Sequence, residues 1–188
     1  MKTAFKIILM AIAYFALFIV GGASGMIHPM CYAYIGAILP IFFAFVYLYS
    51  ASLLRCFGVA TILNGIFLVA ALLAGEADIS FITGIAILTA LSEIIRMVCG
   101  YDTRKGVRWS FLPFAFSFFA FTAHWWTDTE GSLAAAVEEM PTGYDKLMMP
   151  VIDNVPMLII VLLLTIPISI LAMRLAERVL KKQTAVLK

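Results

Sequence analysis

Six long apolar segments, separated by short polar stretches, dominate the hydrophobic pattern of this chain. They cover residues 4–20, 29–49, 57–74, 79–98, 109–126 and 155–173. A helix of about 20 apolar residues crosses a hydrocarbon core of roughly 30 Å, and each segment approaches or exceeds that length. The pattern predicts an all-α membrane protein, with six transmembrane helices in a single domain over residues 1–188 and one long loop at 127–154.

The basic residues are concentrated in alternate connections. Twelve of the 13 Lys and Arg residues fall at the N-terminus, in the second and fourth connections or near and beyond the end of the last segment, and only Lys146 falls in the other three connections. An excess of Lys and Arg in short loops marks the cytoplasmic side of a membrane protein. We therefore expect both termini in the cytoplasm and the 127–154 loop outside.

The composition agrees with a membrane protein. Hydrophobic residues make up 64% of the chain and charged residues 13%, whereas about 25% of a typical soluble domain is charged. The short connections leave no room for an attached soluble enzyme or ATPase. We expect the basic loops to contact anionic lipid head groups and expect no nucleic acid partner.

The interior of the predicted helices contains few polar or irregular residues. Pro40 lies within the second segment and predicts a kink, because proline removes a backbone hydrogen bond. Glu93 and Arg96 are three residues apart near the inner end of the fourth segment. That spacing predicts that they pair with each other and that Arg96 extends toward the membrane surface.

The long loop carries an amphipathic pattern of its own. Leu133, Val137 and Met140 share one helical face, which predicts a short helix lying at the membrane interface. Pro141 and Gly143 end this helix. A second short segment is expected to begin just after them.

The densest polar and aromatic run is residues 124–130, at the outer end of the fifth segment. One interpretation is an aromatic belt at the interface, followed by a solvated acidic turn. The other is a binding site in which aromatic rings stack on a small molecule and polar groups fix its other end. The candidate substrate-binding residues, all expected near the outer side, are His28, Tyr32, Glu76, His124, Trp125, Trp126, Asp128 and Tyr144. A metal site built on the two histidines lacks a nearby Cys ligand, so no metal and no cofactor are expected.

No enzyme signature is present: the chain contains no HExxH, no Walker A and no GxSxG sequence. We therefore expect no catalytic activity, and any ATP-driven function needs a partner chain. Two other classes stay open. One is a membrane enzyme acting on lipid or isoprenoid head groups through His124, Asp128 and Glu130. The other is a structural subunit of a membrane complex.

Several short motifs resemble the Trep_Strep family of integral membrane proteins and, more broadly, the S-components of energy-coupling factor (ECF) transporters. They are the stretch 47–58, Glu93 followed by Gly100-Tyr101 and Lys105, an aromatic at Trp125 or Trp126, Tyr144 in the next outer segment, and the basic end Leu180-Lys181-Lys182.

The resemblance implies a substrate-binding subunit of an ABC importer in the cytoplasmic (inner) membrane of a prokaryote. Such a subunit binds a vitamin or another small nutrient on the outer side. Its implied partners are a transmembrane coupling subunit and two ATPase subunits. The small residues expected to contact the coupling subunit are Ala4, Ala11, Ala86 and Ala90.

Overall fold

Each apolar segment of the sequence is helical in the computed structural model, which describes residues 2–188, and no strand occurs in that range. The elements in chain order are α1 (Lys2–Ala23), η1 (Ser24–Met26), α2 (Pro29–Tyr34), η2 (Ile35–Ala37), α3 (Pro40–Leu53), α4 (Val59–Ala74), α5 (Ile79–Cys99), α6 (Arg104–Phe114), α7 (Ser117–Thr122), α8 (His124–Thr127), α9 (Thr129–Glu139), α10 (Tyr144–Asp153), α11 (Val155–Val179) and α12 (Lys181–Ala185). The prediction of an all-α protein is confirmed.

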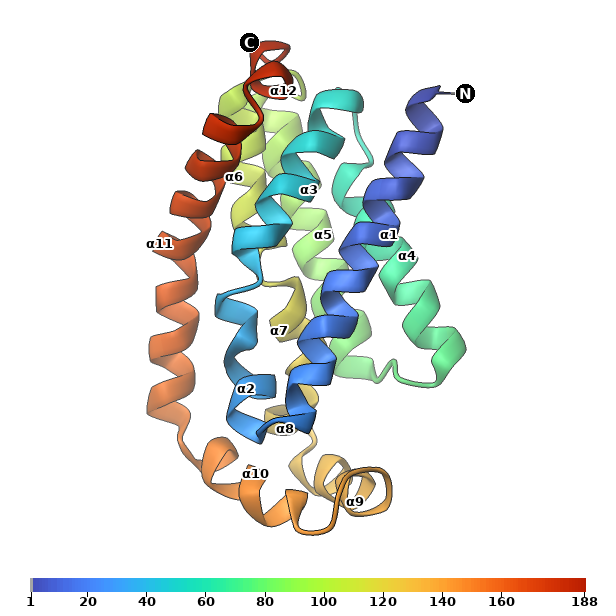
Figure 1. Cartoon of the computed structure of the whole chain (residues 1–188), viewed down its shortest axis with the longest axis vertical. Helices are drawn as coiled ribbons and strands as arrows, with labels where there is room; N and C mark the ends of the chain where they lie inside the picture. Colours follow the sequence, from blue (N-terminus) through green and yellow to red (C-terminus); the bar gives the residue numbers. More distant parts are fainter. Residues whose placement is uncertain (1) are drawn as a thin grey trace.

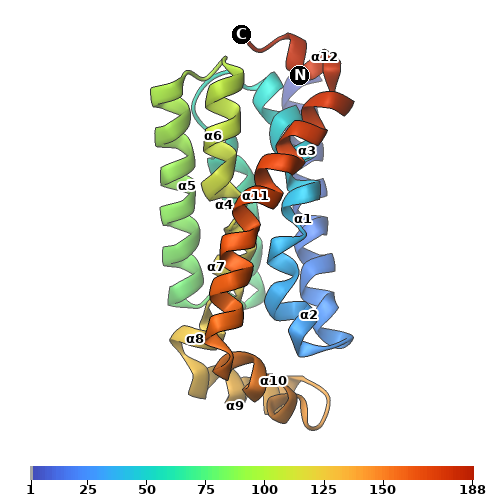
Figure 2. The same ribbon diagram turned by 90° about the vertical axis from the view of Figure 1, so that its left-hand side faces the viewer.

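The long helices run side by side as an elongated bundle (Figure 1). α1 begins and α12 ends at the same end of this bundle. The turned view in Figure 2 shows α9 and α10 lying across the opposite end. The segment 127–154 therefore closes the end of the molecule that is farthest from the chain ends.

The helices differ in their ability to cross a membrane. Among residues 2–188, three helices are long and apolar enough: α5, α11, and α1 with its extension to Met26. A fourth candidate consists of α2–η2 and α3 together and is bent by 42°. α4 is apolar but only 16 residues long. The segment expected at 109–126 is divided among α6, α7 and α8, and its first break follows Pro113. Three or four spans therefore meet these criteria, and the count of six stays a prediction.

The bend between η2 and α3 confirms the kink predicted at Pro40. Proline has no N–H to donate to the preceding turn, and α3 begins at this residue after a 3-10 turn that ends at Ala37.

The distribution of apolar side chains is that of a membrane protein. Large hydrophobic residues on the outer faces of α1 and α11 are exposed, for example Ile12 at 57% and Leu163 at 61%. Large exposed apolar surface of this kind needs a partner or a membrane to cover it. The core is rich in aromatic rings, with Phe18 and Phe67 stacked at a centroid distance of 3.7 Å.

Glu93 does not pair with Arg96, which corrects the prediction from their spacing. The Glu93 carboxylate, 3% exposed, instead accepts hydrogen bonds from the backbone N–H groups of Gly58 (3.1 Å), Ala60 (2.8 Å) and Thr61 (3.2 Å). These amides belong to the N-cap and the first turn of α4, where intrahelical acceptors are missing and the helix dipole favours an anion. Glu93 therefore joins α5 to the start of α4.

Arg96 does not extend to the membrane surface either, because it is fully buried at 0% exposure. Its Nη2 donates to the carbonyl oxygens of Ala51 (3.1 Å), Leu54 (2.7 Å) and Tyr101 (3.0 Å). Two of these carbonyls lie at the C-terminal end of α3, where acceptors are left over and a cation is favoured. Arg96 therefore holds the end of α3 against α5.

Candidate functional site

A cavity of about 300 Å³ lies at the α9–α10 end of the bundle, and we call it the loop-end hollow. Five of the eight residues expected to bind a substrate line it: Tyr32, Glu76, His124, Trp125 and Asp128. They come from α2, from the turn between α4 and α5, and from α8 and its C-terminal end. The remaining side of the hollow is lined by residues of α9 from Gly131 to Glu139 and by Met140, the residue that follows the helix.

Two acidic residues of the loop-end hollow are held in place because each caps the N-terminus of a helix. Asp78 is the N-cap of α5, and its Oδ1 accepts hydrogen bonds from the N–H groups of Ser80 (2.6 Å) and Phe81 (2.9 Å). Asp128 caps α9 in the same way, accepting from Gly131 N–H at 3.3 Å. Asp and Asn are strongly preferred at such positions. The caps therefore fix both carboxylates at the rim of the hollow.

The loop-end hollow has a strongly negative lining. Four carboxylates line it, those of Glu76, Asp78, Asp128 and Glu139, and no Lys or Arg does. Glu76 and Glu139 make no side-chain hydrogen bond or ion pair with other residues in the range 2–188. Acidic groups gathered around a concave surface attract cations. The hollow is therefore suited to a positively charged ligand.

The inner wall of the loop-end hollow is aromatic. The Trp125 ring lies 6.3 Å from Tyr32, nearly perpendicular to it, and 4.8 Å from the His124 ring. Behind it, the Tyr144 ring packs at 6.4 Å. Aromatic faces attract cations and also stack on flat ligands.

Two buried donors, Trp125 in this wall and Tyr144 behind it, lack a hydrogen-bond partner within the described chain. Trp125 is 3% exposed and Tyr144 6%, yet neither the indole Nε1 nor the phenol oxygen has a hydrogen-bond partner there. Burial raises the pKa of Tyr144, so its hydroxyl stays protonated. An unpaired buried polar group costs about 1–3 kcal/mol. Both atoms are also shielded from solvent, so a ligand in the hollow would reach them only if the surrounding side chains moved.

His124 ties α8 to α9. Its Nδ1 lies 2.8 Å from Ser132 Oγ, and that hydroxyl is also 3.1 Å from the His124 carbonyl oxygen. Ser132 is one of the residues lining the hollow that sequence reasoning missed, together with Asp78 and Glu139. The pairing spans eight residues across a turn, so no helical periodicity reveals it.

Three of the expected binding residues do not line the loop-end hollow. His28 is exposed and caps α2, with its Nδ1 accepting from Met30 N–H at 3.1 Å. Trp126 points to α10, where its Nε1 donates to the Ile152 carbonyl at 3.3 Å. Tyr144 supports Trp125 from behind. Among residues 2–188, no three His, Cys, Asp or Glu side chains are grouped closely enough to hold a metal ion.

α9 confirms the helix expected in the long loop, and only part of its predicted apolar face is buried against the bundle. Val137 is 64% exposed, whereas Ser132 and Ala136 are buried at 8% and 4%. Small residues allow α9 to lie close over the hollow, and Glu139 on its far turn reaches the lining. Leu133 and Met140 also pack partly buried against the core, so small and apolar residues together form the face that α9 turns toward the bundle.

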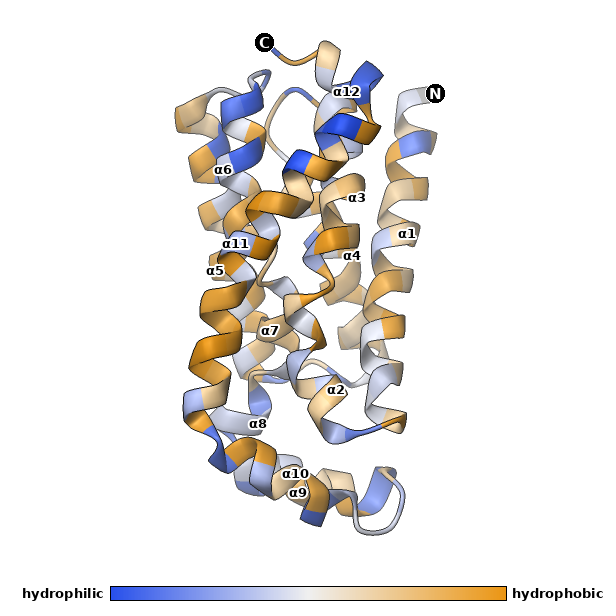
Figure 3. Ribbon diagram, turned by 60° about the vertical axis from the view of Figure 1, so that its left-hand side comes forward, coloured by the Kyte–Doolittle hydropathy of each residue, from blue (hydrophilic) through white to orange (hydrophobic). Residues whose placement is uncertain are grey.

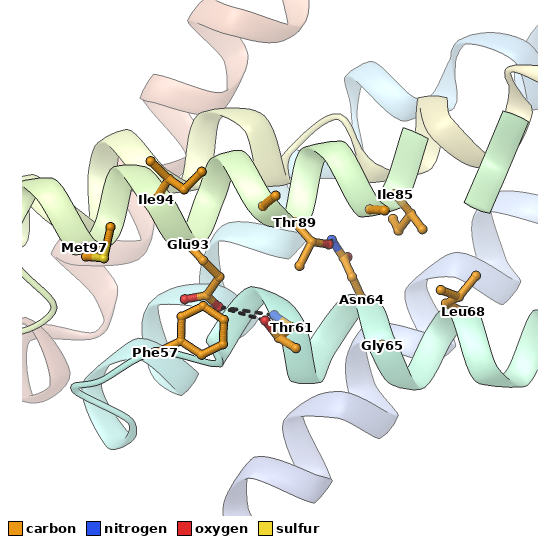
Figure 4. Close-up of a pocket in the computed structure, with 12 residues that line it drawn as sticks. Phe57, Thr61, Asn64, Gly65, Leu68, Ile85, Thr89, Glu93, Ile94 and Met97 are labelled. Atoms are coloured by element: carbon orange, nitrogen blue, oxygen red, sulfur yellow. Dashed lines mark hydrogen bonds between the residues drawn. The ribbon is translucent and has the colours of Figure 1, made fainter. Parts of the chain in front are cut away.

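A second concave surface, the α4–α5 groove, has a volume of about 490 Å³. Figure 4 shows Phe57, Leu68, Ile94 and Met97 along its sides. Inside it Asn64 Nδ2 donates to Thr89 Oγ1 at 2.8 Å, and Tyr14 donates to Asn64 Oδ1 at 2.7 Å from behind. These bonds satisfy the polar groups and leave the groove largely apolar.

Two of the four small residues expected to contact a partner, Ala86 and Ala90, are exposed and line the α4–α5 groove. Ala4 is exposed on α1. Ala11 is only 1% exposed in the core of the bundle, so it packs within the chain and offers no docking surface.

An all-helical bundle with an apolar outer surface and a polar hollow at one end belongs to the class of helical integral membrane proteins. A sequence profile of the Trep_Strep family, described as a hypothetical bacterial integral membrane protein, matches residues 1–185. The match covers nearly the whole chain, so the chain belongs to this family. No curated protein and no solved structure shows significant similarity to it.

Proposed function

We propose that this chain is the substrate-binding membrane subunit, or S-component, of an ECF-type ABC importer, and that it binds a small cationic nutrient. The observation that carries the proposal is the loop-end hollow, where four carboxylates and a buried tryptophan line about 300 Å³ beneath α9. Binding sites for small molecules have volumes of about 300–1,000 Å³ and combine an apolar wall with a few polar groups. The hollow matches the lower end of that range.

The proposed topology places the loop-end hollow on the outer side of the cytoplasmic (inner) membrane of the bacterium. In this topology the chain crosses the membrane six times, with α4 as a short span and α6–α8 together as a broken span. Both chain ends then lie in the cytoplasm, at the end of the bundle where most of the basic residues are found. The positive-inside rule supports this orientation.

The ligand that fits the hollow best is an organic cation with a flat or unsaturated part. The carboxylates attract the positive charge, and the rings of Tyr32 and Trp125 accommodate the flat part. A bare metal ion fits less well, because the acids surround a volume instead of converging on one point.

The proposed partners are a transmembrane coupling subunit and two ATPases. The chain itself has no nucleotide-binding motif and, in this proposal, no catalytic activity. The α4–α5 groove supports docking of a partner helix, since its small side chains at Ala86 and Ala90 permit close approach.

The proposal is tested first by identifying what the purified chain retains. Native mass spectrometry of the detergent-solubilised protein, followed by chromatography of the extracted small molecules, is expected to reveal a cationic compound of matching mass. A panel of organic cations then gives dissociation constants by calorimetry. Retention of an anionic compound, with no affinity for any cation, would contradict the assignment.

Neighbouring residues on α9 provide a matched pair of variants. Glu139 lines the hollow, whereas Glu138 is exposed and outside the lining. Loss of a charged hydrogen bond costs about 1.5–3 kcal/mol, so Glu139→Gln is expected to weaken binding of the identified cation roughly 10- to 150-fold. Glu138→Gln is expected to leave it nearly unchanged. Equal effects of the two substitutions would place the ligand elsewhere.

A further inference from the structure

A basic cavity of about 580 Å³ lies at the opposite end of the molecule from the loop-end hollow, between α6, α11 and α12. We call it the basic cavity. The five cations that line it are Arg104, Arg108, Arg174, Arg178 and Lys181. Glu177 is the single acid among its lining residues. The cavity therefore carries a large positive excess.

Glu177 neutralises only one of these cations. It forms a bidentate pair with Arg108, whose Nε and Nη2 donate to the two carboxylate oxygens at 2.7 Å and 2.6 Å. Such fork-shaped pairing is the strong form of a carboxylate–arginine contact. The other four cations form no ion pair with any residue in the range 2–188. They repel one another, and an anion placed among them would relieve that repulsion.

An apolar cleft of about 240 Å³ adjoins the basic cavity. Trp109, Leu112, Ile170 and Met173 line it, and so do two basic residues of the cavity, Arg108 and Arg174. The two concave surfaces therefore share a border formed by two arginines.

The sequence explains why charge gives way to apolar surface along this border. On α6, Arg104 and Arg108 are one helical turn apart, and Leu112 follows one turn later. On α11, Ile170 precedes Arg174 by one turn, and Arg178 follows it by another. Residues at this spacing share one helix face. Figure 3 shows the same change, from hydrophilic turns of α6 and α11 near the chain ends to hydrophobic turns of α11 toward the middle of the bundle.

We propose that this site binds an anionic phospholipid. The head-group phosphate occupies the basic cavity, and one acyl chain lies in the adjoining cleft beside Leu112 and Ile170. A soluble anion would use the charged part alone, and so would an acidic peptide. Only an amphiphile uses both parts, and the cleft lies on the outer face of the bundle, where Ile170 is 37% exposed. Basic pockets between membrane helices are known to hold anionic head groups.

The bound lipid would join α6 to α11, since both helices contribute arginines to the border. This role is independent of the nutrient bound in the loop-end hollow. It gives the basic residues at this end a specific ligand in addition to their part in setting orientation.

The test compares dioleoylphosphatidylglycerol with dioleoylphosphatidylcholine on the purified full-length chain, by native mass spectrometry and by thermal unfolding in detergent. We expect the anionic lipid to be retained and to raise Tm, and the zwitterionic lipid to do neither. Each cation near an anionic head group is worth about a fivefold change in affinity. The double variant R174Q/R178Q should therefore bind phosphatidylglycerol about 25-fold more weakly.

The matched control is K105Q/K182Q, which removes two exposed charges at the same end but outside the cavity. It should retain binding within about twofold. Ile170→Trp fills the cleft without changing the charge, so it should weaken lipid binding. Glycerol 3-phosphate, which has the phosphate but no acyl chain, should compete only weakly with the lipid, and Ile170→Trp should leave the affinity for this soluble anion unchanged.

Three results would overturn the proposal. Phosphatidylglycerol binding that is unaffected by R174Q/R178Q would exclude the basic cavity. Glycerol 3-phosphate that binds as tightly as the whole lipid would make this a site for soluble anions. Loss of assembly with a protein partner in R174Q/R178Q, with lipid binding intact, would assign the arginines to that partner.

Discussion

At the scale of single residues, the buried carboxylate of Glu93 joins α5 to the start of α4. Its carboxylate accepts hydrogen bonds from three backbone N–H groups at the start of α4. Hydrogen bonds to a charged group contribute about 1.5–3 kcal/mol. We therefore expect Glu93→Gln to lower the free energy of unfolding by about that amount, which corresponds to a fall in Tm of several degrees for a chain of this length.

Thermal unfolding in detergent measures the effect. Glu138→Gln, on the exposed face of α9, is the control, because surface substitutions usually change stability by less than about 0.5 kcal/mol. A Tm for Glu93→Gln equal to that of the control would show that the cap contributes nothing.

The same residue shows where sequence reasoning ends. Glu93 and Arg96 are spaced to pair on one helix, but each finds unpaired backbone groups at the ends of neighbouring helices. The sequence does not show which of these backbone groups lie beside Glu93 and Arg96, because that depends on how the helices pack in the bundle. Candidate residues of the hollow were easier to predict, because Tyr32, Glu76 and His124 all lie near loop ends on one side. Ser132 and Glu139 were missed, since their role depends on how α9 is turned.

At the scale of elements, the last turn of α1 contains two adjacent glycines in different surroundings. A Cβ added at Gly21 would lie 2.8 Å from Phe118 Cζ and 2.9 Å from Leu39 Cδ1, whereas one added at Gly22 would meet nothing within 4 Å. Overpacking in a core costs about 1–3 kcal/mol. We expect Gly21→Ala to lower stability by that amount, because α1 must move away from α7.

Gly22→Ala is the matched control and is expected to be neutral or slightly stabilising, since alanine is the better helix former. Thermal unfolding of both variants, at equal protein and detergent concentrations, gives the comparison. Equal Tm values for the two would mean that α1 does not pack closely against Phe118.

Element prediction succeeded where one local signal decides the outcome. Pro40 lacks an N–H, and the chain bends by 42° just before it. The prediction of elements failed where tertiary packing determines where a helix breaks. The segment 109–126 reads as one apolar run, but it forms α6, α7 and α8, and the breaks place Trp125 and His124 at the hollow. Hydrophobicity alone does not report such breaks.

At the scale of the whole molecule, orientation is the property on which the proposed function depends. The three native cysteines are free, so a cysteine-less background is attainable by replacing Cys31, Cys56 and Cys99. Single cysteines introduced at the exposed Ala134 and Lys182 then report on the two ends of the bundle. A membrane-impermeant maleimide added to intact cells is expected to label position 134 and not position 182. The opposite pattern would invert the topology and remove the basis for a nutrient site.

Accumulation of a nutrient against its gradient needs a source of energy, and the chain has no nucleotide-binding motif. Its two buried ionisable residues near one end, Glu93 and Arg96, both bind backbone groups at helix ends. Ionisable groups spaced through the membrane, as a proton relay requires, are not found within residues 2–188. Uptake should therefore depend on a partner that docks on the bundle.

Ala86→Trp should block docking, because it fills the α4–α5 groove. Ile87→Trp is the control on the next, outward-facing position, which is 54% exposed. In cells, uptake of the identified cation should fall to background in Ala86→Trp and persist in Ile87→Trp. Calorimetry should give both variants the same affinity for the cation, because the loop-end hollow does not include either position.

Liposomes containing the chain alone should bind the cation without concentrating it. Accumulation driven by a proton or sodium gradient in those liposomes would make the chain a secondary transporter.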